Sequence, residues 1–401
     1  MSVLLGNVNQ GLYGGVLMEI PLTLSQTFVP PRNGTVNIIC IGAGGSGGHL
    51  YNSAQGIAVG GGAGGYCLKE SLDVTTGGSF VVTIGAGGAG AASNGAANGV
   101  TGGNTTVSGT GLSATLTANG GVGGSTQLTS NNGEAGGAGG TASNGDINRV
   151  GGAGGSIAGN VSTGNNLHAA TGGGAVAILT SVGYAGGGSA LAASGSAFSQ
   201  EQYLATGGAG IGGRGGGLHN VNGNNPDSLL GFSGGGANHA GHDKTVQYDW
   251  VPSAVTSTGR NEAFTFPYAG ASLIGQSPAI GGAGEVGDYA CNGGGSSAAA
   301  NNRDDNSFFG YNVYGDKNNN TMGAGGGGWY ANNAGRGAGH GGAFAGGGGT
   351  GTYSGSANNV RCGDGGVGGG GGGFYRHGTQ ANGLSGYGGP GIVFIHYTAY
   401  A

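Results

Sequence analysis

Short apolar segments with alternating side chains predict β-strands near both ends of this chain. In residues 66–74, large apolar side chains alternate with smaller or polar ones, which is the period of a strand. We expect one face of that strand to carry Tyr66, Leu68, Leu72 and Val74. The same pattern predicts strands over residues 16–29, 35–41, 66–74, 79–84, 105–107, 112–118 and 392–397. Pro21 has no amide hydrogen, so we expect the first of these strands at a sheet edge.

Glycine-rich runs occupy most of the chain between the early strands and the last one. They include residues 136–140, 151–155, 172–174, 213–217, 325–328, 346–349 and 368–373. The runs are too short for collagen, and the chain as a whole keeps no triplet register. A polyproline-II-like helix has three residues per turn and no internal hydrogen bonds, so buried runs must bond to one another. Only glycine lets two such backbones approach closely, and the runs therefore predict a bundle of polyglycine II helices.

Composition decides whether these runs are ordered. The chain has 401 residues, of which 109 are glycine and only 7% are charged, with a net charge of −5. Glycine-rich chains without a fixed period are usually disordered, but disordered chains generally carry high net charge. A nearly neutral unfolded chain with this many Ile, Val, Tyr and Phe residues would aggregate. We therefore expect an ordered fold.

The expected fold is all-β, with essentially no α-helix, because no segment shows a helical period with caps. It is an antiparallel β-sandwich with long insertions that form the polyglycine II bundle. Four segments follow: an N-terminal attachment segment and edge strand at 1–24, sandwich strands with the first glycine runs at 25–125, the bundle with its surface loops at 126–385, and a closing strand at 386–401. No secretory signal, membrane-spanning stretch or basic patch for nucleic acid is recognisable.

One motif points towards a nucleotide site, and its surroundings argue against it. Residues 42–47 match the pattern G-x-G-x-x-G and follow a predicted strand. A dinucleotide site needs a helix next and an acidic residue about 20 positions on, whereas residues 51–65 form another glycine-rich loop. No lysine stands in a P-loop context. We expect no cofactor.

Other candidate chemistry is sparse. His239, His242 and Asp243 lack the spacing and structural support of known metal sites, so we expect no metal. Glu262, Glu285 and Asp288 keep a polysaccharide-cleaving function open as an alternative. The four cysteines, Cys40, Cys67, Cys291 and Cys362, show no metal-type spacing, and we expect the first two to be small apolar fillers in strands.

Islands poorer in glycine interrupt the runs and concentrate aromatic and polar residues. Connections between packed segments lie at the surface and often carry function, and exposed aromatic rings with Asn, Asp and Arg suit saccharides or protein loops. The alternative is that the rings cover the ends of the bundle. The candidate receptor-binding residues are Tyr248, Trp250, Arg303, Asp304, Phe308, Phe309, Tyr311, Tyr314, Trp329, Tyr330, Tyr375, Arg376 and His377.

The order of motifs resembles the glycine-rich domain of bacteriophage tail fibres and related virion proteins. The likeness is carried by the strand and glycine run at 35–48, by GGYCLKESLDV at 64–74, by GGSFVVTIGAGG at 77–88, by GGNTTVSG at 102–109 and by GGPGIVFIHY at 388–397. It covers residues 26–125 and 386–397. In composition only, the runs are similar to the polyglycine bundles of tip adhesins in T-even-like phages.

The resemblance implies a non-enzymatic virion protein, made in the bacterial host cytoplasm and exposed on the particle. It implies a tail fibre or adhesin that contacts a host surface saccharide or outer-membrane protein through its loops, and other virion proteins through its N-terminal segment. A homotrimer is compatible with it. The chain has no heptad repeat for a long shaft, so a head fibre, a capsid decoration or another virion scaffold is the alternative, followed by a depolymerase.

Overall fold

The computed structural model describes part of the chain, most continuously over residues 16–158 and 340–400. The described residues are 9–10, 16–51, 56–92, 95–128, 133–158, 167–177, 183, 189–190, 202–210, 215, 218–219, 228–231, 244–245, 325–326, 329–331, 338, 340–352, 360–376 and 383–400. All regular structure within these residues is β. The all-β prediction is therefore confirmed for the part of the chain that the structure describes.

The central sheet contains the first and last long strands of the chain side by side. Its order is β1 (Asn9–Gln10), β2 (Val16–Leu22), β27 (Ile392–Ala399), β4 (Gly34–Ile41), β7 (Tyr66–Val74) and β14 (Ile147–Arg149), all antiparallel. Pro21 pairs with Phe394 of β27 on one side, and among the described residues no strand pairs with it on the other. This agrees with the edge position that its missing amide hydrogen predicts.

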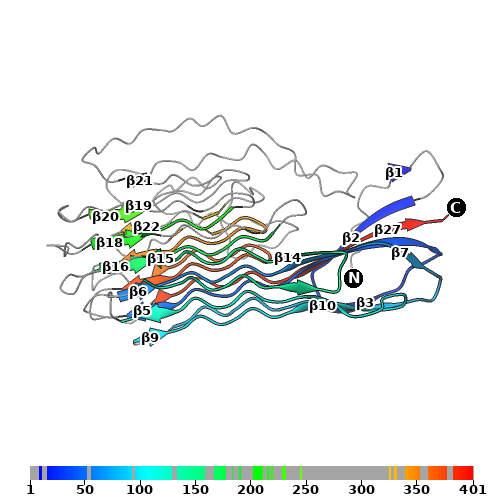
Figure 1. Cartoon of the computed structure of the whole chain (residues 1–401), viewed down its shortest axis with the longest axis horizontal. Coiled ribbons are helices and arrows are strands. Elements are labelled where there is room, and N and C mark those ends of the chain that lie inside the picture. Colours follow the sequence, from blue (N-terminus) through cyan, green and yellow to red (C-terminus); the bar gives the residue numbers. More distant parts are fainter. Residues whose placement is uncertain are drawn as a thin grey trace.

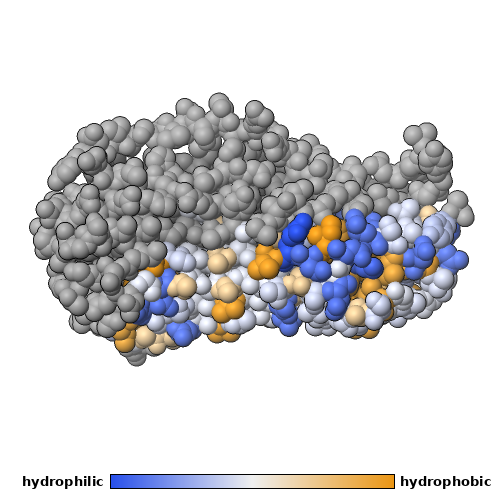
Figure 2. Space-filling view, viewed as in Figure 1, coloured by the Kyte–Doolittle hydropathy of each residue, from blue (hydrophilic) through white to orange (hydrophobic). Residues whose placement is uncertain are grey.

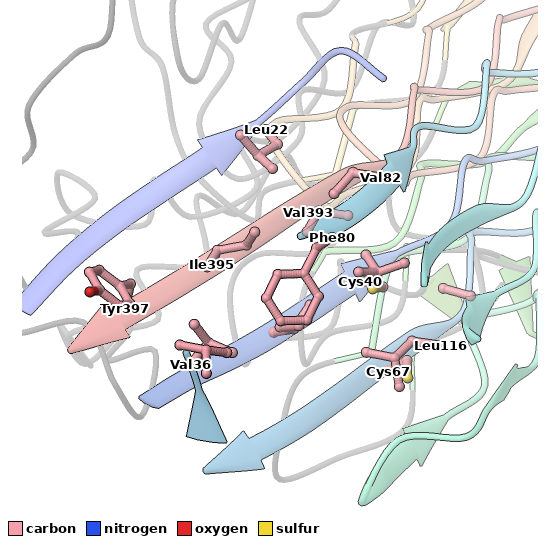
Figure 3. Packing of buried hydrophobic residues seen from close by; sticks show 14 residues of the cluster. Leu22, Val36, Cys40, Cys67, Phe80, Val82, Leu116, Val393, Ile395 and Tyr397 are labelled. Atoms are coloured by element: carbon pink, nitrogen blue, oxygen red, sulfur yellow. The ribbon is translucent and has the colours of Figure 1, made fainter. Parts of the chain in front are cut away.

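A second antiparallel sheet covers one face of the central sheet and completes the sandwich. Its order is β13 (Ala142–Ser143), β11 (Leu116–Ala118), β10 (Thr105–Gly109), β8 (Phe80–Thr83) and β3 (Gln26–Phe28). Figure 3 shows the core between the sheets, where Phe80 and Val82 of β8 lie against Val36, Val393 and Ile395 of the central sheet. These side chains are essentially inaccessible to solvent. The predicted antiparallel sandwich is confirmed.

Strand β7 differs from its predicted alternation because it contains a β-bulge. Val36 of β4 pairs with Leu72 and Ile38 pairs with Lys69, so two residues of β7 oppose the single residue Asn37. Ser71 takes a positive φ of 49°, and its amide donates a hydrogen bond to the Asn37 side chain. A bulge reverses the phase of a strand.

The bulge sends the four large apolar side chains of β7 to opposite faces. Leu72 and Val74 pack in the sandwich core, whereas Tyr66 and Leu68 pack on the other face of the central sheet. The prediction that all four share a face was therefore wrong. Cys67 takes the core position that they leave, and Cys40, its direct partner on β4, lies in the same core. Both thiols are free and buried, as expected for apolar fillers.

The glycine runs extend from the sandwich along the long axis of the molecule and bond to one another (Figure 1). In the run 42–48, the donor amides repeat with a period of three. Every third residue donates to the same neighbour: the amides of residues 42, 45 and 48 donate to the carbonyls of residues 65, 62 and 59. The amides of residues 43 and 46 donate to the carbonyls of residues 103 and 100 in a second neighbour. Those of residues 44 and 47 donate to the carbonyls of residues 389 and 386 in a third. The carbonyls of run 42–48 accept from residues 88, 121, 124, 371 and 374. Three residues per turn and neighbours on all sides are what a polyglycine II bundle requires, and that geometry stays our interpretation of the pattern.

Individual glycine runs at the surface show a three-residue repeat, although the chain as a whole has no such repeat. In residues 135–141, Ala135, Ala138 and Thr141 are exposed, while Gly137 and Gly140 between them are buried. Val100, Val122 and Val150 lie on other outer runs and are 50%, 44% and 45% exposed. Figure 2 shows one side of this surface, with the strongly hydrophilic residues gathered mainly towards the sandwich half. A side chain is therefore tolerated only at the third position, which points away from neighbouring backbones.

The opposite face of the central sheet receives turns of the glycine-rich part. Val176 and Phe344 are buried against Ile39, Ile41 and Phe394. Phe344 lies in a turn in which the amide of Ala345 donates to the carbonyl of Gly342. The central strands are thus buried on both faces, which explains why their sequences are continuous apolar stretches.

Parallel strands form at the end of the bundle that lies away from the sandwich, and the sequence did not predict them. One sheet has the order β12 (Thr126–Gln127), β6 (Gly56–Ala58), β16 (Leu167–Ala170), β18 (Gln202–Ala205) and β20 (Ser228–Gly231). Another has β22 (Trp329–Ala331), β23 (Thr350–Thr352), β25 (Phe374–Arg376), β5 (His49–Tyr51) and β9 (Ala96–Ala97). Shorter sheets join β15 (Ile157–Ala158), β17 (Ser189–Ala190), β19 (Leu218–His219) and β21 (Lys244–Thr245), and β24 (Val360–Arg361) with β26 (Gly383–Leu384).

The four sequence segments share one hydrogen-bond network. Run 42–48 bonds to runs 59–65 and 100–103 and also to residues 386 and 389 beside the closing strand, and run 59–65 bonds to residues 152 and 368. The limits at 24, 125 and 385 stay a prediction from the sequence pattern.

Candidate functional site

The end of the bundle opposite the sandwich brings together residues that are far apart in the sequence. Four glycine-rich runs each lead into a short strand, and these strands pair in parallel and in register. Trp329, Thr350, Phe374 and His49 consequently occupy one row, in this order across the sheet. We call the two sheets that contain β25 and β6 the distal end; both are mainly parallel, with β9 and β12 as antiparallel edge strands. Figure 1 places them away from β2, β7 and β27.

The distal end has an aromatic and apolar interior. The rings of His49 and Phe374 stack with centroids 5.0 Å apart. Leu50 and Tyr375 pack with Ala58 and Ala170 of the facing sheet. All these side chains are buried. They close the end of the bundle, which agrees with the alternative that rings cover it.

Two predicted receptor-binding residues lie inside this interior. Tyr375 is 0% exposed and Arg376 is 1% exposed. Burial lowers the pKa of the Arg376 guanidinium below its ordinary value. We had expected both on a surface loop, but they belong to β25, which is paired on both sides. Groups this deeply buried do not present a binding surface, so we leave both out of the proposal below.

The other predicted residues lie mostly outside what the structure describes. Trp329 and Tyr330 are placed in β22 by their backbone. Outside the described residues are Tyr248, Trp250, Arg303, Asp304, Phe308, Phe309, Tyr311, Tyr314, His377 and Cys291, the candidate metal residues His239, His242 and Asp243, and the carboxylates Glu262, Glu285 and Asp288. Their roles stay predictions.

Chain connections at the distal end alternate with the buried strands. Strand β5 ends at Tyr51 and β6 begins at Gly56; β25 ends at Arg376 and β26 begins at Gly383. Sequence reasoning had missed His49 and Leu50. A repeated signal was available, because Trp329, Thr350, Phe374 and His49 each directly follow glycine. The distal end is therefore a set of short strands carried on hydrogen-bonded glycine runs.

The backbone amides of the nucleotide-like motif are already engaged in hydrogen bonds of the bundle. The amides of residues 42–47, which would cradle a phosphate in a nucleotide site, all donate to backbone carbonyls of other runs. The motif leads from β4 into β5 with no helix between them. Within the part of the chain that the structure describes, no three His, Cys, Asp or Glu side chains come close enough to hold a metal ion.

Acid should destabilise the fold through two buried histidines. His49 and His396 are 2% and 1% exposed, and burial lowers the pKa of each imidazole to about 4. The unfolded chain takes up these protons near pH 6.5. Stability is therefore complete above about pH 6.5 and falls as the pH drops towards 4, by up to about 3 kcal/mol for each histidine. Urea unfolding at several pH values in this window measures the loss, and His396→Gln should reduce it; an unchanged loss in that variant would contradict the assignment.

Comparison with known proteins gives a family. A family model described as a glycine-rich domain matches residues 22–249. No curated protein matches the chain. In the described residues, no helix has the length and apolar character needed to span a bilayer.

Proposed function

Because the chain belongs to the glycine-rich domain family, we propose that it is a non-enzymatic structural protein of a bacteriophage virion. It acts as a tail fibre or adhesin at the particle surface and contacts the host cell through loops at the distal end of the bundle. One observation carries the proposal: the long strands β2 and β27 lie at one end of the molecule, and the short strands β5, β6, β16 and β18 lie at the other (Figure 1).

The glycine runs suit the task of holding the loops at a distance from the attachment point. Each run is bonded to several others along its length, as in run 42–48. In the polyglycine II interpretation the bundle is a stiff block, because bending one run breaks bonds to all its neighbours. Binding residues are most often loops held by a rigid scaffold. The fold therefore serves presentation rather than catalysis.

The proposed partners differ between the two ends. Residues 1–24 enter the sandwich end through β2 and attach the protein to other virion proteins. A host surface saccharide or outer-membrane protein is bound through Tyr248, Trp250, Arg303, Asp304, Phe308, Phe309, Tyr311, Tyr314, Trp329, Tyr330 and His377. A homotrimer is the arrangement that a fibre would use. A head fibre or capsid decoration would use the same scaffold with a different partner at the distal loops.

Competition for host cells tests the proposal. Purified protein should bind susceptible cells and inhibit infection by the phage that carries it, and Trp250→Ala together with Arg303→Ala should weaken both effects. Thr83→Ala, on the exposed face of the sandwich, is the matched control and should leave both unchanged. Binding to particles that lack the protein, without binding to cells, would favour a decoration protein. Release of reducing ends from capsule or lipopolysaccharide would favour a depolymerase.

A further inference from the structure

The C-terminal strand fills a slot in the middle of the central sheet. Strands β2 and β4 do not pair with each other, because β27 lies between them. It pairs with β2 from Leu22 to Leu17 and with β4 over its whole length, Ile392–Ala399. Without β27 the sheet would have two unpaired edges facing each other, and open edges recruit strands.

Both faces of β27 are buried. Val393, Ile395 and Tyr397 point into the sandwich core, as Figure 3 shows. Ile392 and Phe394 point to the other face and pack in the cluster that contains Val176 and Phe344. The strand therefore connects the two hydrophobic clusters that hold the sandwich to the glycine-rich part. Its neighbour β4 does the same, with Val36, Ile38 and Cys40 in the sandwich core and Ile39 and Ile41 on the other face.

The glycine run before β27 is equally embedded in the bundle. Amides of residues 386 and 389 donate to carbonyls of residues 372 and 369 in one run, and those of residues 388 and 391 donate to residues 88 and 85 in another. A Cβ on Gly388 or Gly389 would overlap the carbonyl oxygens of Gly44 and Gly366. Residues 383–399 thus form one continuous segment that contacts the sandwich and the bundle at once.

This segment lies far along the chain from the strand it pairs with. The family model ends at residue 249, whereas β27 pairs over its whole length with β4, which lies in the matched region. We propose that residues 383–399 are a donor segment: the slot between β2 and β4, with its continuation in the bundle, also accepts this segment from a second copy of the chain. Insertion of a strand from another molecule is a known mode of assembly, and exchange of an identical element joins copies without new contacts.

A chain with an engineered protease site tests whether the donor segment can be supplied by a separate molecule. A protease site placed between Arg376 and Gly383 allows the full chain to be folded first and then cut. The cut protein is unfolded and refolded with an excess of fluorescent peptide that spans residues 383–401. The peptide should enter the refolded protein in proportion to its molar share. A peptide carrying Gly388→Val and Phe394→Asp should be excluded.

The uncut chain, refolded in parallel, makes each result decisive. If it refolds and the cut chain either fails to refold or excludes the wild-type peptide, the segment works only within its own chain and the proposal is overturned.

For exchange between copies, two differently tagged full chains are refolded together at high concentration. Mixed dimers whose yield falls when the peptide is added are expected, and a failure to form any would overturn exchange between copies. Neither result depends on receptor binding, so failure here leaves the proposed function standing.

Discussion

Replacing Gly370 by valine is expected to unfold the protein. Gly370 lies in the most glycine-rich run of the chain, donates its amide to the carbonyl of Gly174 and is fully buried. A Cβ at this position would overlap the carbonyl oxygen of Gly61 in a neighbouring run. That oxygen belongs to backbone that is bonded on several sides and has no free direction in which to move.

The expected loss exceeds that of ordinary overpacking. Extra methylene groups in a core cost about 1–3 kcal/mol because side chains adjust, but here two backbones would have to separate and several hydrogen bonds would break. We expect a loss of at least about 4 kcal/mol, a range reached only by severe defects. For a domain of ordinary stability, about 5–15 kcal/mol, much of the variant would be unfolded or insoluble.

Ala138→Val is the matched control. Ala138 also lies in a glycine run, but it holds the exposed third position between the buried Gly137 and Gly140. The larger side chain extends into solvent, so the free energy of unfolding should change by less than about 0.5 kcal/mol. Soluble yield and thermal unfolding measure both variants. Similar behaviour of the two would mean that the runs are not packed backbone to backbone.

Phe344→Ala should cost about 3–5 kcal/mol, the usual loss for a large buried ring. The ring lies against Phe394 with centroids 6.4 Å apart and joins a turn of the glycine-rich part to the central sheet. Its loss leaves a cavity at the junction between the sandwich and the bundle. Chemical denaturation should show a lower midpoint, and we expect the two parts to unfold together because β27 contributes to both.

The stability of Phe344→Gly should be compared with that of Phe344→Ala, because the usual order of the two is expected to be reversed. Phe344 has a φ of +69°, a left-handed conformation that costs an L-residue roughly 1–2 kcal/mol and glycine almost nothing. The free energy of unfolding of the glycine variant should therefore exceed that of the alanine variant by about 1 kcal/mol, the reverse of the usual order. If alanine proved more stable, the backbone at this turn would not retain the strained conformation in the variants.

The amino-acid sequence determined the strands of the sandwich. Residues 35–41, 66–74 and 392–397 were located because their apolar residues are contiguous or alternate, and glycine marks where they end. It also indicated that the glycine runs are ordered, since a chain with so few charges would not stay soluble unfolded. These are local properties, and local composition is enough to reveal them.

The sequence could not give the features that depend on distant partners. The bulge at Ser71 requires Asn37 of another strand, so no alternation within residues 66–74 predicts it. The burial of Tyr375 and Arg376 follows from parallel pairing with β5, more than 300 residues earlier in the chain. Adjacent glycine runs look alike in sequence, because a backbone hydrogen bond carries no side-chain signature.

Sequence alone thus indicated where this protein is extended and where it is rich in glycine, and it predicted the order that the described residues show. Tertiary structure decided which run bonds to which, which aromatic residues are buried at the distal end, and that the last strand completes a sheet begun by the first. The physical reason is that glycine runs specify close packing but not the partner. Which run is the partner depends on parts of the chain that are distant in sequence, as the bonds from run 42–48 to residues 386 and 389 show.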